Sequence, residues 1–227
     1  MGHLKWTFMQ CEMKDNCFAR NYWVSGKIMP RTGQLAPDTP TDTPFQILKA
    51  FEYYRVFKSD EGDVKFVTEL LGGGSKERAM DWVAHIDRDN KRDAYAWRHL
   101  PTTDVGTFRL DDHVWIWNAL KALSIVLDWR QKTKADPKVR RREAKESSSE
   151  NLRKKYDPEK VQREVSRRFT TENDHSRQRM LAVTRCSREN RFSFHSRDTA
   201  LFYKLAGGFL TEGAGVSSDI WRNTLES

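Results

Sequence analysis

Two adjacent carboxylates, Asp111 and Asp112, precede the most apolar stretch of the chain, residues 114–129. Like charges on neighbouring side chains favour a proton on one of them, and a protonated carboxyl is what a general acid supplies. His113 and Trp115 come directly after them, so groups for proton transfer lie beside an aromatic face. A second interpretation stays open, because the helix dipole alone favours acids in the first turn of a helix.

Adjacent residues are poor partners for each other in the cleavage of a glycosidic bond. The two carboxyl groups of a glycosidase flank that bond from opposite sides, about 5–10 Å apart. We therefore expect Asp111 or Asp112 to serve as one catalytic carboxylate, acid or base, while the second comes from elsewhere in the chain.

A second group of candidate binding residues lies near the N-terminus, where residues 14–23 mix Asp, Asn, Arg, Tyr and Trp without helical or strand periodicity. Sugar rings stack on aromatic faces, and their hydroxyls take polar partners such as arginine. This composition predicts substrate-binding roles for Arg20, Tyr22 and Trp23, and Trp6, which precedes this stretch, is a further candidate for stacking on a sugar. An ordinary capped turn with a buried tryptophan is the alternative.

The histidines and glycines point to neither a metal nor a nucleotide cofactor. The six histidines have no pair at metal-ligand spacing, and Cys11 and Cys17 are not at a standard zinc spacing. The glycine run at residues 72–74 follows a predicted helix and does not precede one, so it cannot cradle a phosphate. We expect no metal and no cofactor.

The elements that must position these residues are mostly helices. Apolar residues at helical spacing predict three consecutive helices within residues 44–87, a buried helix over residues 114–129 and a further helix that opens at Asp157. Residues 180–184 and 192–194 read as short strands. Stacked helical hairpins with a short β element near the C-terminus are thus the expected architecture, in the mainly α class.

Positive charge is concentrated in one part of the chain. The 227 residues carry a net charge of +8. Residues 130–198 hold 21 Lys and Arg against 11 Asp and Glu, so the rest is slightly acidic. Composition divides the chain into a helical domain (1–129), a basic, partly disordered insert (130–179) and a C-terminal α/β segment (180–227) that packs back on the helices. The insert is interpreted as a solvated linker, or as a site for an acidic partner at residues 138–155.

Several classes of protein are disfavoured. No run approaches the roughly 18 apolar residues of a membrane span, and no basic-then-apolar leader opens the sequence. Three cysteines do not make a disulfide framework. We expect a cytoplasmic protein without a membrane association.

The run Asp-Asp-His-Val-Trp-Ile-Trp at residues 111–117 resembles the Asp-Asp-His-Leu-Trp-Leu segment at a helix start in inverting disaccharide and oligoglucan phosphorylases. Those enzymes share an (α/α)6 toroid with the six-hairpin glycosidases. The resemblance covers roughly residues 1–129 and, more faintly, 181–224. It implies a partial (α/α) toroid in which Asp111 and Asp112 lie near a sugar subsite. It also implies that His113 and Trp115 line this subsite, with Arg20 and Trp23 holding hydroxyls and stacking on the sugar.

The sequence departs from this family in two respects. It holds fewer helices than the twelve of a complete toroid, and it lacks the separate Asp-Trp-Asn-Asp type general-acid motif. The leading hypothesis is therefore a carbohydrate-active, glycoside hydrolase-like protein that acts on an oligosaccharide or polysaccharide, with an incomplete or inactive form of such an enzyme left open. The alternative is a non-catalytic basic module that binds nucleic acid or another acidic partner. Self-association is also expected, because a half-built toroid exposes apolar helix faces.

Overall fold

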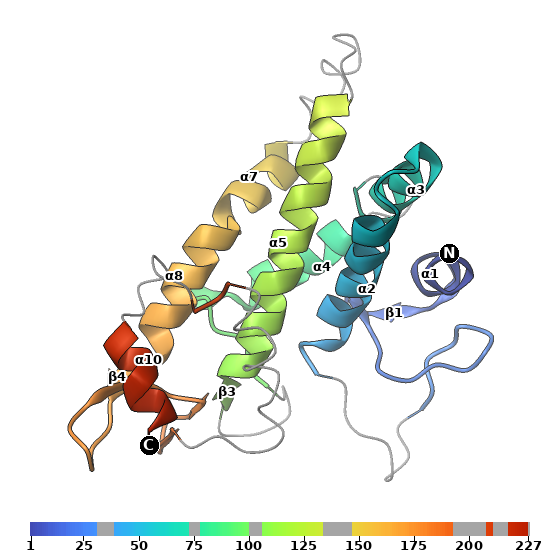
Figure 1. Ribbon diagram of the computed structural model, residues 1–227. Coiled ribbons are helices and arrows are strands. Elements are labelled where there is room, and N and C mark those ends of the chain that lie inside the picture. The colour runs from blue at the N-terminus through green and yellow to red at the C-terminus, as the bar shows by residue number, and fades with distance from the viewer. Residues whose placement is uncertain are drawn as a thin grey trace. The chain divides into compact units, whose positions relative to one another are not determined.

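The fold is mainly helical, with short antiparallel strands (Figure 1). The computed structural model describes residues 1–30, 39–72, 78–99, 106–133, 147–192, 208–210 and 218–226. The expected mainly α class with a small β element is confirmed at this level. The finer expectation of a partial toroid of stacked hairpins stays a prediction.

Two compact units make up the chain, and each is built from separate stretches of sequence. Unit 1 comprises Met1–Asp89 and Ala119–Asp157, and unit 2 comprises Asn90–Asn118 and Pro158–Ser227. These units cut across the three consecutive segments expected from composition. The helix at residues 110–133 contributes its first part to unit 2 and its second part to unit 1.

Unit 1 consists of helices and one small hairpin. Its described elements are α1 (Gly2–Lys5), the π-helical turn η1 (Trp6–Gln10), β1 (Met13–Lys14), β2 (Cys17–Phe18), α2 (Asp42–Phe57), α3 (Glu61–Gly72), α4 (Arg78–Asp89), the second part of α5 (Leu110–Thr133) and α7 (Ser147–Lys155). Helix α2 packs on α3, and α4 packs on α3 and α7. The three consecutive helices expected in residues 44–87 are thus present.

Helix α2 begins in a polar turn that also holds the hairpin. The backbone N–H of Phe18 donates to Thr43 Oγ1 over 2.8 Å, and the N–H of Thr39 donates to Asp42 Oδ2 over 2.6 Å. Along the helix, Ile47 is fully buried. The Thr-Asp-Thr-Pro start is therefore fixed by side-chain acceptors that satisfy neighbouring backbone donors.

A buried arginine ties α4 to the N-terminal helical turn. The Arg78 side chain is 7% exposed, and its Nη1 donates to the carbonyl oxygen of Cys11 over 2.5 Å. The same nitrogen lies 3.4 Å from the carbonyl oxygen of Thr7. Burial lowers the pKa of Arg78 from its ordinary value. The guanidinium thus acts as a C-terminal cap for η1, where carbonyl groups lack intrahelical partners.

Replacement of Arg78 by methionine is expected to lower the free energy of unfolding by about 2 kcal/mol. The cap hydrogen bonds are lost, and the carbonyl oxygens of Thr7 and Cys11 lose the donor that Arg78 supplies. Urea unfolding measures the change. Arg55→Met is the matched control, because Arg55 is exposed and pairs with exposed Glu52 on the same helix. Equal stabilities of the two variants would contradict the capping role.

Unit 2 combines helices with two small sheets. Its described elements are η2 (Lys91–Asp93), β3 (Phe108–Arg109), the first part of α5, α8 (Pro158–Phe169), β4 (Thr170–Glu172), β5 (Arg179–Leu181), β6 (Thr184–Arg185), β7 (Asn190–Arg191) and α10 (Ser218–Leu225). Strands β4 and β5 form a hairpin, and β3, β6 and β7 form an antiparallel sheet in that order. Helix α10 packs on β5, where the N–H of Leu181 donates to Thr224 Oγ1 over 2.8 Å.

Part of the expected insert belongs to the core of unit 2. The side chains of Val161, Val165 and Phe169 on α8 are fully buried, as their helical spacing predicts. Residues 147–179 are therefore built into the two units as helices and strands. Residues 134–146 lie outside the described part of the chain.

None of the helices in the described ranges is long and apolar enough to cross a membrane. The expected cytoplasmic location stays a prediction.

Candidate functional site

The junction of β3 and α5 brings the two adjacent carboxylates to a defined place in unit 2. Arg109 ends β3, and Asp111 and Asp112 lie in the first turn of α5. The N–H of Leu110 donates to the carbonyl oxygen of Val183 over 2.9 Å, which fixes the helix start to the sheet. A helix N-terminus stabilises negative charge, so the position itself suits both acids. Both residues are buried, with exposed fractions of 6% and 3%.

Asp111 is held by a guanidinium fork. Arg109 Nε lies 3.0 Å from Oδ1 of Asp111, and Nη2 lies 2.5 Å from Oδ2. Paired hydrogen bonds between arginine and a carboxylate are strong and directional. In this arrangement Asp111 accepts hydrogen bonds, and donating a proton as a general acid would require it to leave the pair.

Asp112 is paired with a histidine from the preceding loop. Its Oδ2 lies 2.7 Å from His99 Nδ1. His99 Nε2 faces Arg109 Nη1 at 3.5 Å. Because arginine can only donate, Nε2 of the neutral ring is the acceptor and Nδ1 carries the proton towards Asp112. The His99 side chain is 22% exposed, against 4% for Asp112.

These pairs form one continuous row, in which His99 and Arg109 face each other and each of them holds one carboxylate. We call it the polar cluster, and it consists of His99, Arg109, Asp111 and Asp112. Its carboxylates are buried, whereas the side chains of His99 and Arg109 retain 22% and 15% exposure. The cluster therefore presents a partly accessible edge with hydrogen-bond donors and acceptors, backed by fixed charges.

His113 lies behind the polar cluster and is fully buried. Its Nδ1 lies 2.6 Å from the carbonyl oxygen of Arg109, and Nε2 accepts from the N–H of Trp97 over 3.1 Å. Burial lowers the pKa of His113 to about 4, which keeps the ring neutral with its proton on Nδ1. Its ring also packs against Phe169, with centroids 4.9 Å apart. Both ring nitrogens thus serve the backbone, so His113 can position the cluster but has no nitrogen to spare for a sugar.

The two tryptophans of the motif differ in exposure. Trp117 is buried, its Nε1 donates to the carbonyl oxygen of Pro158 over 3.0 Å, and its ring packs on Phe209. Trp115 is half-buried, so it retains surface for stacking. This difference agrees with helical geometry, in which residues two apart lie on different faces.

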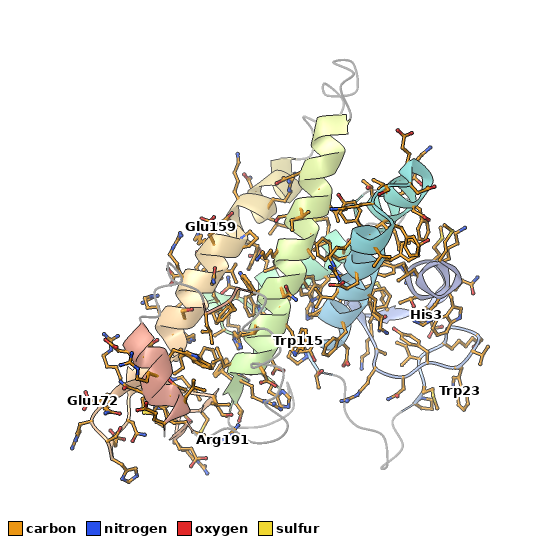
Figure 2. The ribbon with its side chains drawn as sticks, viewed as in Figure 1. His3, Trp23, Trp115, Glu159, Glu172 and Arg191 are labelled. Atoms are coloured by element: carbon orange, nitrogen blue, oxygen red, sulfur yellow. The ribbon has the colours of Figure 1, made fainter. Side chains whose placement is uncertain are left out.

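The four predicted N-terminal binding residues belong to unit 1. Tyr22 and Trp6 are half-buried, whereas Arg20 and Trp23 are exposed. The Tyr22 hydroxyl accepts from the N–H of Ala19 over 2.7 Å and donates to the carbonyl oxygen of Glu12 over 2.8 Å. Figure 2 shows Trp23 at the outer edge of this segment, and its exposed fraction is 53%.

Residues 14–23 are more regular than their composition suggests. Strands β1 and β2 pair in antiparallel register around Asp15 and Asn16, both of which have positive φ. Trp6 meets the ring of Tyr22 edge to face, with centroids 6.0 Å apart, and its Nε1 donates to the carbonyl oxygen of Val24. The expected irregular loop is therefore a hairpin followed by a second turn. Trp23 is the aromatic ring of this group with the largest exposed surface.

The predicted site residues fall into two groups that the structure describes separately. Asp111, Asp112, His113 and Trp115 lie together in unit 2, and Trp6, Arg20, Tyr22 and Trp23 lie together in unit 1. A single pocket formed by all eight residues stays a prediction.

Sequence reasoning missed the partners of the two carboxylates. His99 and Trp97 lie 13 and 16 residues away from the groups they contact, in a segment without periodicity. The only available signal was composition, since a buried carboxylate needs a partner, and Arg109 and His99 are the nearest basic residues before Asp111 in the sequence.

Two members of the predicted acidic-partner site are already paired. Arg153 Nη2 lies 2.7 Å from Asp128 Oδ1, and Lys155 Nζ lies 2.8 Å from Asp87 Oδ1. These ion pairs neutralise part of the positive charge of α7. The basic run at residues 138–142 lies outside the described residues, and an acidic partner at residues 138–155 stays a prediction.

Comparisons with known proteins assign neither a family nor a function to the chain. No family model, no curated protein and no solved structure matches the chain. Within the described ranges, no three His, Cys, Asp or Glu side chains gather into a group that could hold a metal ion. The chemistry of the polar cluster is therefore the basis for a functional proposal.

Proposed function

We propose that the chain is a carbohydrate-active protein of the glycoside hydrolase type, built on a partial (α/α) toroid, and that the polar cluster binds sugar hydroxyls. The observation that supports this is the row of His99, Arg109 and the two carboxylates at the start of α5. A sugar hydroxyl donates one hydrogen bond and accepts others. A row of fixed acceptors and donors matches that pattern.

Within this proposal the two acids have different roles. Asp111 is occupied by Arg109 through two hydrogen bonds, so it orients the guanidinium. Asp112 acts through His99, which it holds at Nδ1 over 2.7 Å. Nε2 of His99 faces Arg109 Nη1 at 3.5 Å, and a hydroxyl or water molecule that gives its proton to Nε2 takes the place of that contact. A carboxylate behind an imidazole stabilises the imidazolium that forms when the ring takes a proton. The Asp112–His99 pair is thus the proposed proton-transfer group of the cluster.

Cleavage of a glycosidic bond needs a second carboxyl group across the bond. Asp111 and Asp112 are adjacent on one helix turn, so together they cannot supply both faces. Sugar binding by the polar cluster does not require hydrolysis. Binding is therefore measured separately from cleavage. Trp115, which is half-buried on the same helix as the two acids, is the proposed stacking surface.

Asp112→Asn is expected to weaken oligosaccharide binding by about tenfold, because the acceptor that holds His99 Nδ1 loses its charge and a charge-assisted hydrogen bond becomes a neutral one. The amide can still accept from His99 Nδ1, so the fold is retained. Thermal shift and calorimetry with α- and β-glucan, xylan and mannan oligosaccharides measure binding, because a ligand stabilises only a protein with a competent site. Release of reducing ends tests hydrolysis separately.

Asp219→Asn is the matched control, since Asp219 is an exposed carboxylate of unit 2 that pairs with Arg222 on α10. Its oligosaccharide affinity should equal that of the wild type. Absence of any thermal shift across the panel, or equal affinity of the Asp112 variant, removes the support for sugar recognition at this cluster.

A further inference from the structure

Two arginines lie close together where α8 ends and the three-stranded sheet begins. Arg168 is in the last turn of α8, and Arg185 is in β6 directly opposite Phe108 of β3. Arg185 Nη1 donates to the backbone carbonyl oxygen of Arg168. The guanidinium carbon of Arg168 lies 5.9 Å from the centroid of the Phe108 ring. Within unit 2, one guanidinium thus lies over the Phe108 ring, and a second arginine lies opposite Phe108 in the sheet.

Neither guanidinium has an acidic partner in the part of the chain that the structure describes. Arg185 Nε donates to Asn190 Oδ1 over 3.0 Å, which is a neutral acceptor. Arg168 makes its contact with the ring of Phe108. The adjacent Arg167 differs, because its Nη2 lies 2.6 Å from Glu164 Oε2.

Burial makes this arrangement costly without an anion. Both arginine side chains are half-buried, and a charge removed from water needs a compensating partner. Burial, followed by the positive charges of Arg185 and Arg167, lowers the pKa of Arg168. The dipole at the end of α8 favours one cation there only weakly. This helix dipole does not explain why a second arginine, Arg185 of β6, lies beside Arg168.

We propose that Arg168 and Arg185 bind a phosphate group. The planar donors of two guanidinium groups match the oxygens of a tetrahedral dianion, and arginine is the side chain best suited to such recognition. The Phe108 ring supplies an apolar wall beside the anion. The phosphate is either free inorganic phosphate or the phosphate of a phosphomonoester, and both present the same oxygens.

This phosphate site is distinct from the polar cluster. Successive side chains of a strand point to opposite faces. Phe108 therefore shares a face with Arg185 and Asn190, whereas Arg109 shares the other face with Thr184 and Arg191. Arg191 is labelled in Figure 2. The inference does not rest on the proposed sugar-binding function, and either can fail while the other holds.

Calorimetric titration of the full chain with inorganic phosphate, at constant ionic strength set with sodium chloride, tests the proposal. We expect saturable binding by the wild type, and Arg168→Gln should weaken it by about tenfold. Arg167→Gln is the matched control from the same helix turn, and its affinity should stay within about twofold of the wild type, because Arg167 is exposed and held by Glu164. Glycerol 2-phosphate in a parallel titration identifies the source, since tighter binding than inorganic phosphate indicates a phosphomonoester.

Two outcomes overturn the proposal. One is a response to phosphate that sodium chloride reproduces at equal ionic strength, which is screening of like charges only. The other is equal affinity of the Arg168→Gln variant and the wild type. Should that variant fail to fold, Arg168→Lys decides the matter, because it keeps the charge and loses the fork. It should bind inorganic phosphate more weakly than the wild type, and unchanged affinity counts against the site.

Discussion

Acidification from pH 7 to pH 4 is expected to lower the free energy of unfolding by about 3 kcal/mol through His113 alone. Burial lowers the pKa of this side chain from 6.5 to about 4 in the folded chain. Between these two values the unfolded chain binds a proton that the folded chain does not. The stability that His113 contributes is thus fully present above pH 6.5 and is lost as the pH falls towards 4.

The pKa of His113 is low because its ring is buried, and both nitrogens of this ring already have hydrogen-bond partners. Nδ1 faces the carbonyl oxygen of Arg109 and Nε2 accepts from the N–H of Trp97, so a second proton on Nε2 would meet a donor. The ring is fully buried against Trp97 and Phe169, which excludes water from the charged form. Protonation therefore requires this part of unit 2 to open.

His113→Gln isolates this effect from the titration of the carboxylates. Glutamine offers one acceptor and one donor and does not ionise. Urea unfolding of both proteins at several pH values between 4 and 7.5, followed by near-ultraviolet circular dichroism, gives the difference in stability. That difference should favour the wild type at pH 7 and shrink by about 3 kcal/mol towards pH 4. Parallel pH profiles for the two proteins would show that His113 does not titrate as described.

The helices were the part of the fold that apolar spacing predicted well. The buried stretch at residues 114–129 and the stripe of Val161, Val165 and Phe169 both lie in observed helices. The predicted bounds were too short where polar residues form the first turn. Helix α2 begins at Asp42 and α5 begins at Leu110, because acids and small polar residues in a first turn interrupt the apolar pattern but satisfy backbone donors.

The candidate site could be predicted only in part. The position of Asp111 and Asp112 at a helix start follows from the sequence alone, and the structure confirms this position. Asp112 pairs with His99 because the loop before β3 brings His99 back to the start of α5, and no local sequence pattern predicts this loop conformation. The Arg168–Arg185 contact likewise depends on the register between β3 and β6. A signal for the N-terminal hairpin did exist, since Asp15 and Asn16 are residues that tolerate the positive φ of a two-residue turn.

Gly26→Ala is expected to lower the free energy of unfolding by about 3 kcal/mol. Gly26 has φ of +83°, a conformation that costs other residues about 1–2 kcal/mol. A Cβ at this position would lie 2.9 Å from the carbonyl oxygen of Gln10 and 3.2 Å from the Cα of Cys11. Both atoms belong to the backbone, so neither can move aside as a flexible side chain would.

The close approach at Gly26 holds the second turn of unit 1 on the N-terminal helical segment. The Glu12 N–H donates to the carbonyl oxygen of Gly26 over 2.8 Å, and the Gly26 N–H donates to that of Trp23 over 2.8 Å. Gly2→Ala is the matched control, because Gly2 begins α1 and a Cβ there meets nothing within 4 Å. Urea unfolding should show a loss for Gly26→Ala and no loss for Gly2→Ala, since alanine favours a helix. Because the exposed ring of Trp23 is presented by this same turn, Gly26→Ala should also change the accessibility of Trp23 to acrylamide quenching. Unchanged stability of Gly26→Ala would mean that the turn is not packed against residues 10–11 in solution.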